Sequence, residues 1–320
     1  MSLKSLEHLA SKVPFEALPP NWGTFALGRF SADKSLWDYQ QQALRLALAV
    51  LFKFYEEFED FIPGEDASAD VARKRKLTEW YADGMLLSAK ERNSLNLSLA
   101  RAKRPLQELV DDFFALDEAN PQLDFERLCN RMGFWMATGS GKTLVLVKLL
   151  EILHLLMRRQ EIPVCDVLML THREDLLVQF QNAINEYNHA PDAPIHIELC
   201  ELREYSEAKR EAPGGLLGRD STLRVFYYRS DNLSDEHKER IVDFRNYDNG
   251  GRWYVLLDEA HKGVAEDSKR KYIYTIMTRA GFLFNFSATF TDNLDLATTV
   301  HNFNLAEFIS RGYGLSLIHI

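Results

Sequence analysis

The run MATGSGKT at residues 136–143 constrains the fold more than any other stretch, because it joins a strand-like segment to a helix-like one. The apolar run FWMA before and into it, at 134–137, predicts a buried strand, and the apolar spacing after it predicts a helix over 142–160. The glycines at 139 and 141 let backbone amides point at an anion without a Cβ in the way. The run therefore predicts a phosphate-binding loop and a nucleotide ligand.

The residues of this loop have separate expected roles. Lys142 would reach the terminal phosphates of a nucleotide, and the Thr143 hydroxyl would hold Mg²⁺. The general phosphate-loop pattern has a glycine at the position of Met136, so the chain departs from the pattern there. The alternative interpretation is a Gly/Ser turn that happens to precede Lys-Thr. Under the first interpretation, the ATP-binding residues of the loop are Thr138, Gly139, Ser140, Gly141, Lys142 and Thr143.

Overall charge and composition exclude some kinds of protein. The net charge of −9 argues against a protein that coats nucleic acid through bulk electrostatics, although it leaves room for a local basic groove. No apolar run approaches the roughly 18 to 20 residues needed to cross a bilayer, so we expect no membrane contact. The N-terminus lacks the pattern of an export signal, and the three cysteines are too far apart for a disulfide frame or a metal knuckle. These features favour a cytoplasmic location.

From Arg131 onward, apolar strand-like runs alternate with amphipathic helix-like runs, which is typical of a mostly parallel sheet covered on both faces. We therefore predict an α/β fold with a doubly wound sheet, in a domain that spans residues 131–312. After Thr289 there is room for one more helix and a strand near the domain edge. The predicted strands are 134–137, 167–170, 196–200, 223–228, 253–258 and 282–288. The predicted helices are 142–160, 173–188, 234–247 and 268–279.

The first 130 residues lack the alternation of strand-like and helix-like runs. Prolines and a glycine interrupt residues 1–35, so we expect an irregular lead-in on the surface there. Residues 35–61 predict a long amphipathic helix, and the remainder of 36–130 is helical and heavily charged. The basic run at 73–76 is either a contact to a nucleic-acid backbone or a solvated helix face. We expect residues 36–130 to be a helical insertion ahead of the sheet domain.

A second run contains residues that could take part in catalysis. This run, WYVLLDEAH at residues 253–261, has two carboxylates at the end of a predicted strand. In open α/β folds, ligands bind at the carboxyl ends of the strands. Asp258 is then positioned to hold Mg²⁺, and Glu259 to orient and deprotonate an attacking water. A strand can also end in Asp-Glu at an ordinary turn. Its coincidence with a phosphate loop upstream favours a site that hydrolyses ATP.

Taken in chain order, these runs resemble the motifs of superfamily 2 helicases and translocases. MATGSGKT is similar to their motif I, DEAH at 258–261 to motif II, and FSAT at 286–289 to motif III. THREDLLVQF at 171–180 resembles motif Ia, which meets the sugar–phosphate backbone. DYQQQAL at 38–44 resembles the Q-motif region, in which Gln40 would read the adenine edge.

Within that superfamily, the chain most resembles the Res subunit of type III restriction enzymes and related DEAD/DEAH-box proteins of bacterial restriction and phage defence. The likeness rests on the long insertion before motif I and on the phrases FWMATGSGKT, YYRSDN, LLDEAHKG and FNFSATFTD. It implies a RecA-like P-loop NTPase fold and DNA-dependent ATP hydrolysis, with ATP and Mg²⁺ as cofactors. It also implies double-stranded DNA as the track, a modification or specificity subunit as a partner, and cleavage of DNA only in longer relatives.

The resemblance also implies roles for single residues. It assigns catalysis to Lys142, Glu259 and His261. His261 would couple the ATP site to motif III through Ser287 and Thr289. The alternatives are a surface histidine that caps a turn at position 261, and a helix N-cap at Thr289.

Contacts to nucleic acid are implied at Thr171, Arg173, Gln179 and Arg229. Arg173 and Gln179 could equally be exposed helix positions. Arg229 belongs, with Tyr228, to an aromatic and basic cluster at the end of a predicted strand.

Superfamily 2 motors complete their ATP site with an arginine from a second RecA-like domain, and we find no motif of that domain in these 320 residues. We expect the chain to be an N-terminal ATPase domain that hydrolyses ATP slowly by itself, with residues 313–320 a truncated or non-native end. Two alternatives stay open. One is a non-hydrolysing module that reports bound ATP to a partner subunit. The other is an RNA-dependent DEAH-box helicase.

Overall fold

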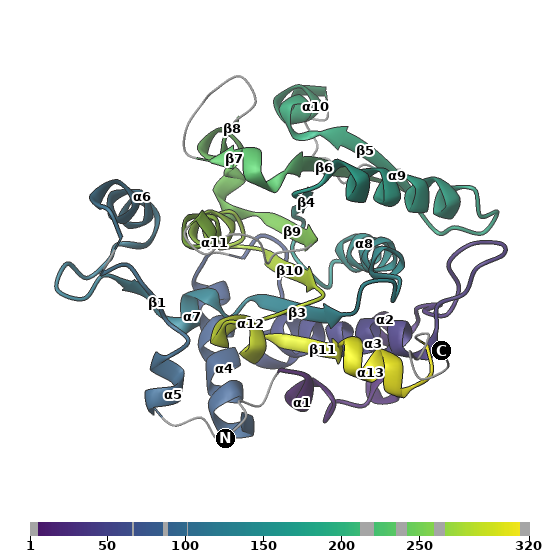
Figure 1. Cartoon of the computed structure of the whole chain (residues 1–320), viewed down its shortest axis with the longest axis horizontal. Helices are drawn as coiled ribbons and strands as arrows, with labels where there is room; N and C mark the ends of the chain where they lie inside the picture. Colours follow the sequence, from purple (N-terminus) through teal and green to yellow (C-terminus); the bar gives the residue numbers. More distant parts are fainter. Residues whose placement is uncertain are drawn as a thin grey trace, which may run out of the picture.

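A seven-stranded, all-parallel sheet forms the centre of the molecule, which confirms the predicted α/β, doubly wound fold (Figure 1). The structure is a computed structural model that describes residues 6–65, 67–85, 89–100, 102–211, 221–234, 242–258 and 266–313. The order of the strands in the sheet is β11-β3-β10-β9-β4-β6-β5. The strands are β3 (Arg131–Met136), β4 (Asp166–Thr171), β5 (His196–Glu201), β6 (Thr222–Arg229), β9 (Trp253–Asp258), β10 (Phe282–Ser287) and β11 (Thr299–Phe303).

Helices cover both faces of this sheet, because its strands are apolar on both sides. On one face, Phe134 and Leu256 pack in a cluster that includes residues of the long helices α3 (Asp38–Phe52), α8 (Lys142–Arg158) and α9 (Glu174–Asn188). On the other face, Leu168 and Val255 pack with residues of α11 (Glu266–Met277) and α10 (Tyr205–Glu211). The two side-chain sets of the strands β4, β6, β9 and β10 therefore belong to two separate cores.

The N-terminal residues 6–35 are irregular outside three short helical segments, as the prolines predict, but they pack into the domain and do not form a surface lead-in. The helix α1 (Leu6–Ala10) contacts β11, and its side chains Leu6 and Leu9 are fully buried. Trp22, on α2 (Pro20–Gly23), is also fully buried and meets the Phe52 ring edge-on at 5.7 Å between centroids. The scattered apolar residues have no helical period, but their burial stabilises the outer layer of the domain. A 3₁₀ turn spans Phe15–Ala17.

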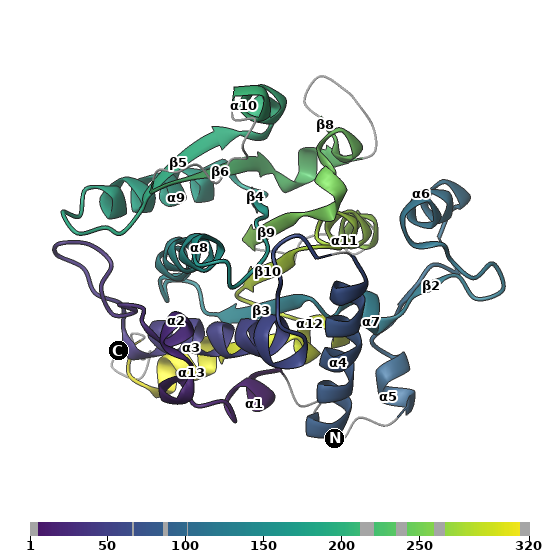
Figure 2. The same cartoon turned by 180° about the vertical axis from the view of Figure 1, so that it is seen from behind.

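The segment between α3 and the sheet gathers at one side of the molecule, where the paired β1 and β2 project with α6 away from the sheet (Figure 2). Helix α3 continues into a π-helical stretch, Lys53–Phe58. The remaining elements are α4 (Ala67–Met85), α5 (Ala89–Asn93), β1 (Leu97–Ser98), α6 (Arg104–Phe114), β2 (Gln122–Leu123) and α7 (Phe125–Leu128). Most of this segment is helical, as expected, and the short antiparallel pair β1–β2 is an addition to the prediction.

The basic run 73–76 is largely internal. Arg73 is fully buried, where its guanidinium donates to the Glu65 carboxylate and to the Glu59 and Asp60 carbonyl oxygens. Lys74 is also buried and donates to the Arg279 carbonyl oxygen. Only Arg75 of these four is exposed. The run therefore holds α4 against the loop before it, and neither interpretation offered by the sequence describes it.

The helix predicted at 234–247 is wrong at the residues that the structure describes. The chain there forms β7 (Leu233–Ser234), β8 (Val242–Asp243) and 3₁₀ turns at Phe244–Tyr247 and Asn249–Gly251. Val242 and Phe244 are buried while Asp243 and Arg245 pair with each other, so the burial has a period of two. Beyond Thr289, the chain forms α12 (Asn293–Ala297), the edge strand β11 and α13 (Leu305–Ser310), one short helix more than expected.

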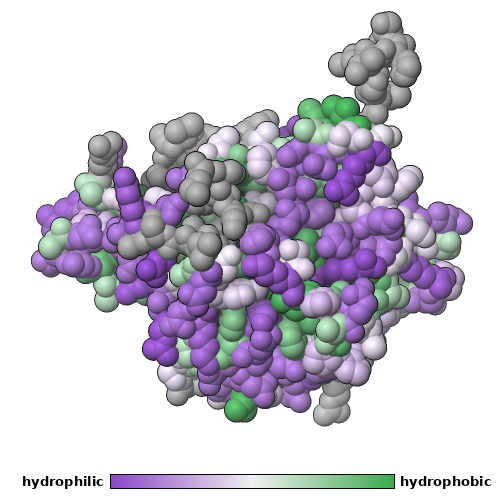
Figure 3. Space-filling view, turned by 90° about the horizontal axis from the view of Figure 1, so that it is seen from below, coloured by the Kyte–Doolittle hydropathy of each residue, from purple (hydrophilic) through white to green (hydrophobic). Residues whose placement is uncertain are grey.

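The face of the molecule seen from below in Figure 1 is mostly polar. Figure 3 shows one face of the molecule, on which hydrophobic atoms appear only as small separate spots. Among the residues that the structure describes, none of the helices combines the length and the apolar character that crossing a membrane requires.

Candidate functional site

The carboxyl ends of four neighbouring strands bring the predicted motifs together. The strands β3, β10, β9 and β4 lie side by side in that order, although β4 follows β3 in the chain. Their register sets Ser287 beside Trp135, and sets Asp258 between Phe286 and Thr171. In this order the strands end at motif I, motif III, motif II and motif Ia. Residues from the whole length of the sheet domain therefore share one edge, where open α/β folds bind ligands.

The loop between β3 and α8 has the backbone geometry of an anion cradle. Gly139 and Gly141 have φ values of +81° and +77°, which only glycine adopts without strain. No described residue accepts a hydrogen bond from the amides of Gly139, Gly141 or Thr143. These donors lie at the amino end of α8, where the helix dipole also favours a negative charge. The loop residues are therefore arranged to bind phosphate.

The side chains of the loop differ in exposure. Thr138 and Gly139 are exposed, and Lys142 and Thr143 are half-buried. The Lys142 ammonium turns back along the loop and donates to the Met136 carbonyl oxygen at 3.4 Å. Ser140 is instead 1% exposed, and its hydroxyl donates to the Ala137 carbonyl oxygen at 2.7 Å. Ser140 thus closes the turn internally, whereas Lys142 and Thr143 remain within reach of a ligand.

Two side chains of α3 support the phosphate loop by hydrogen bonds to its backbone. The Tyr39 hydroxyl donates to the Ser140 carbonyl oxygen at 2.8 Å, and the Gln40 Nε2 donates to the same oxygen at 2.9 Å. The Gln40 Oε1 accepts from the Trp37 amide at 2.8 Å, and the residue is 1% exposed. Both ends of this amide are therefore engaged within the protein, and its contact to adenine stays a prediction. Trp37 itself is 58% exposed, and its ring meets the Tyr313 ring edge-on at 5.2 Å between centroids.

The carboxylate of Asp258 is 5% exposed at the end of β9. Strand side chains alternate between faces, so Asp258 lies on the face of Tyr254 and Leu256, the face that α8 covers. It is thus on the same side of the sheet as the phosphate loop. Glu259 and His261, the predicted base and coupling residues, lie outside the described residues.

Motif III forms a tight turn directly after β10. The Ser287 hydroxyl donates to the Thr289 carbonyl oxygen at 2.7 Å and accepts from the Thr289 amide at 3.1 Å. Ser287 is fully buried, whereas Thr289 is exposed. The N-cap of the following helix is Asp292, so the alternative of an N-cap at Thr289 is wrong. The Trp135 indole donates to the Ala288 carbonyl oxygen at 2.9 Å, which joins motif III to the strand of motif I.

The four residues predicted to contact nucleic acid have different surroundings. Thr171 is 1% exposed and lies next to Asp258, so it belongs to the sheet edge at which the four motifs meet. Gln179 is an exposed residue of α9. Arg173 pairs with Asp175.

Arg229 has two carboxylate partners. Its guanidinium donates to Asp231 at 2.7 Å and to Glu174 at 3.2 Å. The hydrogen bond that Arg229 donates to Asp231 is the main reason that the pKa of Arg229 is raised. The cations at this edge thus have carboxylate partners, and contact with a phosphate would require an exchange of partners.

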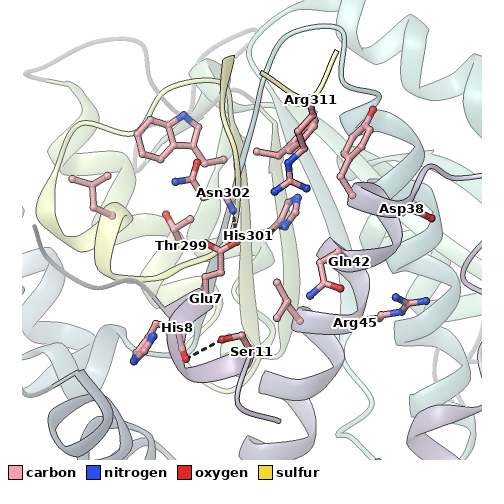
Figure 4. Close-up of a pocket in the computed structure, with 15 residues that line it drawn as sticks. Glu7, His8, Ser11, Asp38, Gln42, Arg45, Thr299, His301, Asn302 and Arg311 are labelled. Carbon is pink, nitrogen blue, oxygen red and sulfur yellow. Dashed lines mark hydrogen bonds and ion pairs between the residues drawn. The ribbon is translucent and has the colours of Figure 1, made fainter. Parts of the chain in front are cut away.

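A large cavity lies beside the edge strand β11 and is lined by residues of α1, α3 and β11 (Figure 4). Its volume is about 1060 Å³, and it extends from α1 across β11 to α3 and Arg311. His301 points into it, is 4% exposed, and has no hydrogen-bond partner for either ring nitrogen among the described residues. Burial, with a smaller contribution from Arg311, lowers the pKa of His301 to about 4. The imidazole is therefore neutral at physiological pH.

Sequence reasoning missed the side chains that support the motifs. Tyr39 holds the phosphate loop, and Trp135 holds motif III. The Phe303 ring stacks on Tyr39 at 4.0 Å between centroids, and the Phe303 carbonyl oxygen accepts from the Ala137 amide. Only Tyr39 had a signal in the sequence, since it is the aromatic residue that immediately precedes Gln40.

Comparison with protein-family models finds a match over residues 34–292, to the family described as type III restriction enzyme, res subunit. The matched range runs from the segment before α3 to the N-cap residue of α12 and includes every strand of the sheet except β11. A search of curated proteins finds no match.

Proposed function

The chain belongs to the type III restriction enzyme res subunit family, which makes it a superfamily 2 helicase-like ATPase domain, and we propose that it hydrolyses ATP with Mg²⁺ on double-stranded DNA. The proposal assigns the chain to restriction–modification or phage defence in the cytoplasm. It also assigns residues 131–312 to a first RecA-like domain and 36–130 to an insertion packed on it.

The observation that carries the proposal is the convergence of four motifs at one sheet edge. Motif I, motif III and Asp258 lie at the ends of adjacent strands, β3, β10 and β9. All parallel strands end at one edge, but chance similarity does not predict that these runs would follow strands that are neighbours in the sheet, since the order in the sheet differs from the order in the chain. An ATPase of this superfamily requires that meeting, because phosphate, metal and coupling residues act on one nucleotide.

The residues at this edge fit ATP and Mg²⁺. The amides of Gly139, Gly141 and Thr143 would hold the phosphates, and Lys142 would neutralise charge on the terminal ones. The Thr143 hydroxyl and the Asp258 carboxylate are oxygen ligands of the kind Mg²⁺ prefers. When bound, Mg²⁺ supplies positive charge against the phosphate oxygens. Glu259 would take the proton from the attacking water.

Contact with the nucleic acid is proposed at the neighbouring strand ends. Arg173, Gln179 and Arg229 are accessible there, at the ends of β4 and β6 and on α9. Exposed ion pairs such as Arg173–Asp175 contribute little free energy, so the arginines can exchange carboxylates for phosphates. Thr171 is too buried for direct contact and would act by orienting the turn, since its hydroxyl oxygen accepts from the Arg173 amide at 3.4 Å.

Two partners complete the proposal. One is a second RecA-like domain, whose arginine would stabilise charge on the transferred phosphoryl group. The other is a modification or specificity subunit, which would select the DNA sequence.

The test measures ATP hydrolysis by the full-length protein, with and without duplex DNA. We expect stimulation by DNA, loss of turnover with retained ATP binding in Glu259→Gln, and loss of ATP binding in Lys142→Ala. Lys12→Ala is the matched control, because Lys12 is an exposed lysine just after the C-terminal end of α1. It should change neither ATP turnover nor ATP binding.

Other results would replace the proposal with one of two alternatives. Tight ATP binding without turnover, under every nucleic-acid condition, would identify a nucleotide-gated binding module. Stronger stimulation by RNA than by DNA would identify an RNA-dependent helicase.

A further inference from the structure

A group of charged and polar side chains behind motif III plays no part in the ATP site proposed above. Lys271 extends from α11, and Asp292 and Asp295 lie at the N-cap and first turn of α12. Asn285 is on β10, and Arg131 begins β3. We call these five residues the α11–α12 cluster.

The contacts within the α11–α12 cluster join the elements that flank motifs II and III. The Lys271 ammonium pairs with the Asp292 carboxylate and lies 3.9 Å from Asp295 Oδ2. The Asn285 Nδ2 donates to Asp295 Oδ1 at 3.3 Å. Lys271 is on the helix that follows motif II, and both aspartates follow motif III. One ammonium group therefore connects the two motifs through elements outside the ATP site.

A second contact extends the connection to motif I. The Arg131 guanidinium donates to the Thr275 hydroxyl on α11 at 3.0 Å, and Arg131 is 5% exposed. Its strand, β3, leads directly into the phosphate loop. Helix α11 is thus fixed to the motif I strand at Thr275 and to the motif III segment at Lys271, one helical turn apart.

The two aspartates of the cluster differ in charge behaviour. Burial, together with the hydrogen bond to Asp292, raises the pKa of Asp295 to about 7. Burial also acts to raise the pKa of Asp292, but hydrogen bonds from Asp295 and Lys271 outweigh it and lower that pKa to about 2. Asp292 is therefore ionised at physiological pH. Asp295 changes its charge near neutrality, where Lys271 and the Asn285 amide lie beside it and the charge of Arg131 acts on it from further away.

We propose that Lys271 is a positioning residue, which fixes motif III against the helix after motif II and thereby transmits nucleic-acid binding to ATP hydrolysis. The inference rests on the function proposed above, because it concerns the stimulation of that same ATPase. The physical reason is that an ion pair has two discrete states, engaged or broken, which a coupling element requires. Asn285 stands two residues before Ser287 on β10, so the same contacts also set where the motif III turn begins.

The experiment compares Lys271→Met with the full-length wild-type protein in ATP hydrolysis, with and without duplex DNA, and in ATP binding. We expect ATP binding within about twofold of wild type and a stimulation by DNA that falls about tenfold. Lys271→Arg keeps the positive charge and should restore most of the stimulation. Lys34→Met removes another lysine–carboxylate pair, Lys34–Glu186 at 2.6 Å, and should leave stimulation unchanged.

A second variant tests the cluster without removing the lysine. An ionised Asp295 gives Lys271 a second carboxylate, so DNA stimulation of the wild type should rise from pH 6 to pH 8. Asp295→Asn has the same shape and no charge at any pH. Its stimulation should stay at the wild-type pH 6 level across this range. If Lys271→Met does not fold, this isosteric variant still tests whether the α11–α12 cluster affects stimulation by DNA.

The outcomes separate the inference from the proposed function. If the wild type is not stimulated by nucleic acid, the proposed function fails and the inference fails with it. If the wild type is stimulated and Lys271→Met is stimulated equally, only the inference is overturned. A pH profile in Asp295→Asn that follows the wild type also overturns it.

Discussion

The hydroxyl of Tyr39 donates a hydrogen bond of 2.8 Å to the carbonyl oxygen of Ser140, so a helix about one hundred residues upstream carries the phosphate loop. Burial raises the pKa of Tyr39 to about 12, which keeps this hydroxyl protonated and therefore a donor. The ring of Tyr39 is fixed in turn by stacking on Phe303. The shape of the loop thus depends on contacts with both ends of the described chain.

Replacing Tyr39 with Phe removes this hydrogen bond and keeps the ring. We expect ATP affinity to fall about fivefold, because a neutral hydrogen bond contributes about 1 kcal/mol. Titration with a fluorescent ATP analogue measures the change. Tyr313→Phe is the matched control, since the Tyr313 ring also contacts Phe303 while no described residue bonds its hydroxyl. Equal affinity in Tyr39→Phe and wild type would contradict the supporting role.

The two loop glycines should respond differently to alanine. Both have positive φ, so either substitution costs about 1 to 2 kcal/mol of backbone strain. A Cβ at Gly139 meets nothing within 4 Å, whereas a Cβ at Gly141 comes within 2.4 Å of Gln40 Nε2. Gly141→Ala should therefore lower both ATP affinity and the melting temperature more than Gly139→Ala does. Adding Gln40→Ala should recover part of the difference. A double variant no better than Gly141→Ala alone would rule out the clash.

His301 should make stability depend on pH. Its folded pKa of about 4 lies below the ordinary histidine value of 6.5, so the unfolded chain binds the proton more readily. Stability is then complete above pH 6.5 and is lost as the pH falls toward 4. Between pH 7 and pH 5 this amounts to about 2 kcal/mol in the free energy of unfolding.

Urea unfolding of wild type and His301→Gln at the two pH values checks this prediction. The variant should lose about 2 kcal/mol less than the wild type over this interval, whatever its stability at pH 7. An unchanged pH dependence would mean that another group titrates.

Arg73 should matter for stability and not for binding. It is fully buried, and removing one partner of a buried ion pair costs about 3 to 5 kcal/mol. Arg73→Met should therefore lower the free energy of unfolding by that amount. Arg75→Met, at the exposed neighbouring position, should change it by less than about 0.5 kcal/mol. A loss of DNA affinity in Arg73→Met at a temperature where it is folded would restore the nucleic-acid interpretation of this run.

The sequence predicted the elements whose pattern is local. The strand and helix on either side of Gly141 have strong periods of their own, and so do the strands that end at Asp258 and Ser287. Parallel strands then bring their carboxyl ends to one edge whatever the intervening loops do. For that reason, the position of Asp258 near motif III could be predicted from the sequence.

The predictions from the sequence that were wrong or missing share a physical cause, because each involves contacts between residues distant in the chain. Nothing local predicts that Trp22 is buried, or that Arg73 reaches the backbone of Glu59 and Asp60. At 234–247 a helix was expected, but the alternating burial of Val242 and Phe244 determined the structure. The internal use of the Gln40 amide depends on Ser140, which only the folded chain brings near.

The strand that leads into the phosphate loop has an unusual dependence on the order of synthesis. In the sheet, β3 lies between β10 and β11, and both neighbours are built from residues 282–303. A ribosome that has produced β3, α8 and β4 has therefore made a strand with no partner on either side. Exposed strand edges of this kind are prone to aggregate until they are paired. ATP capture by a nascent chain should consequently begin only after Phe303 has left the exit tunnel, which would make nucleotide binding a late marker of completed folding.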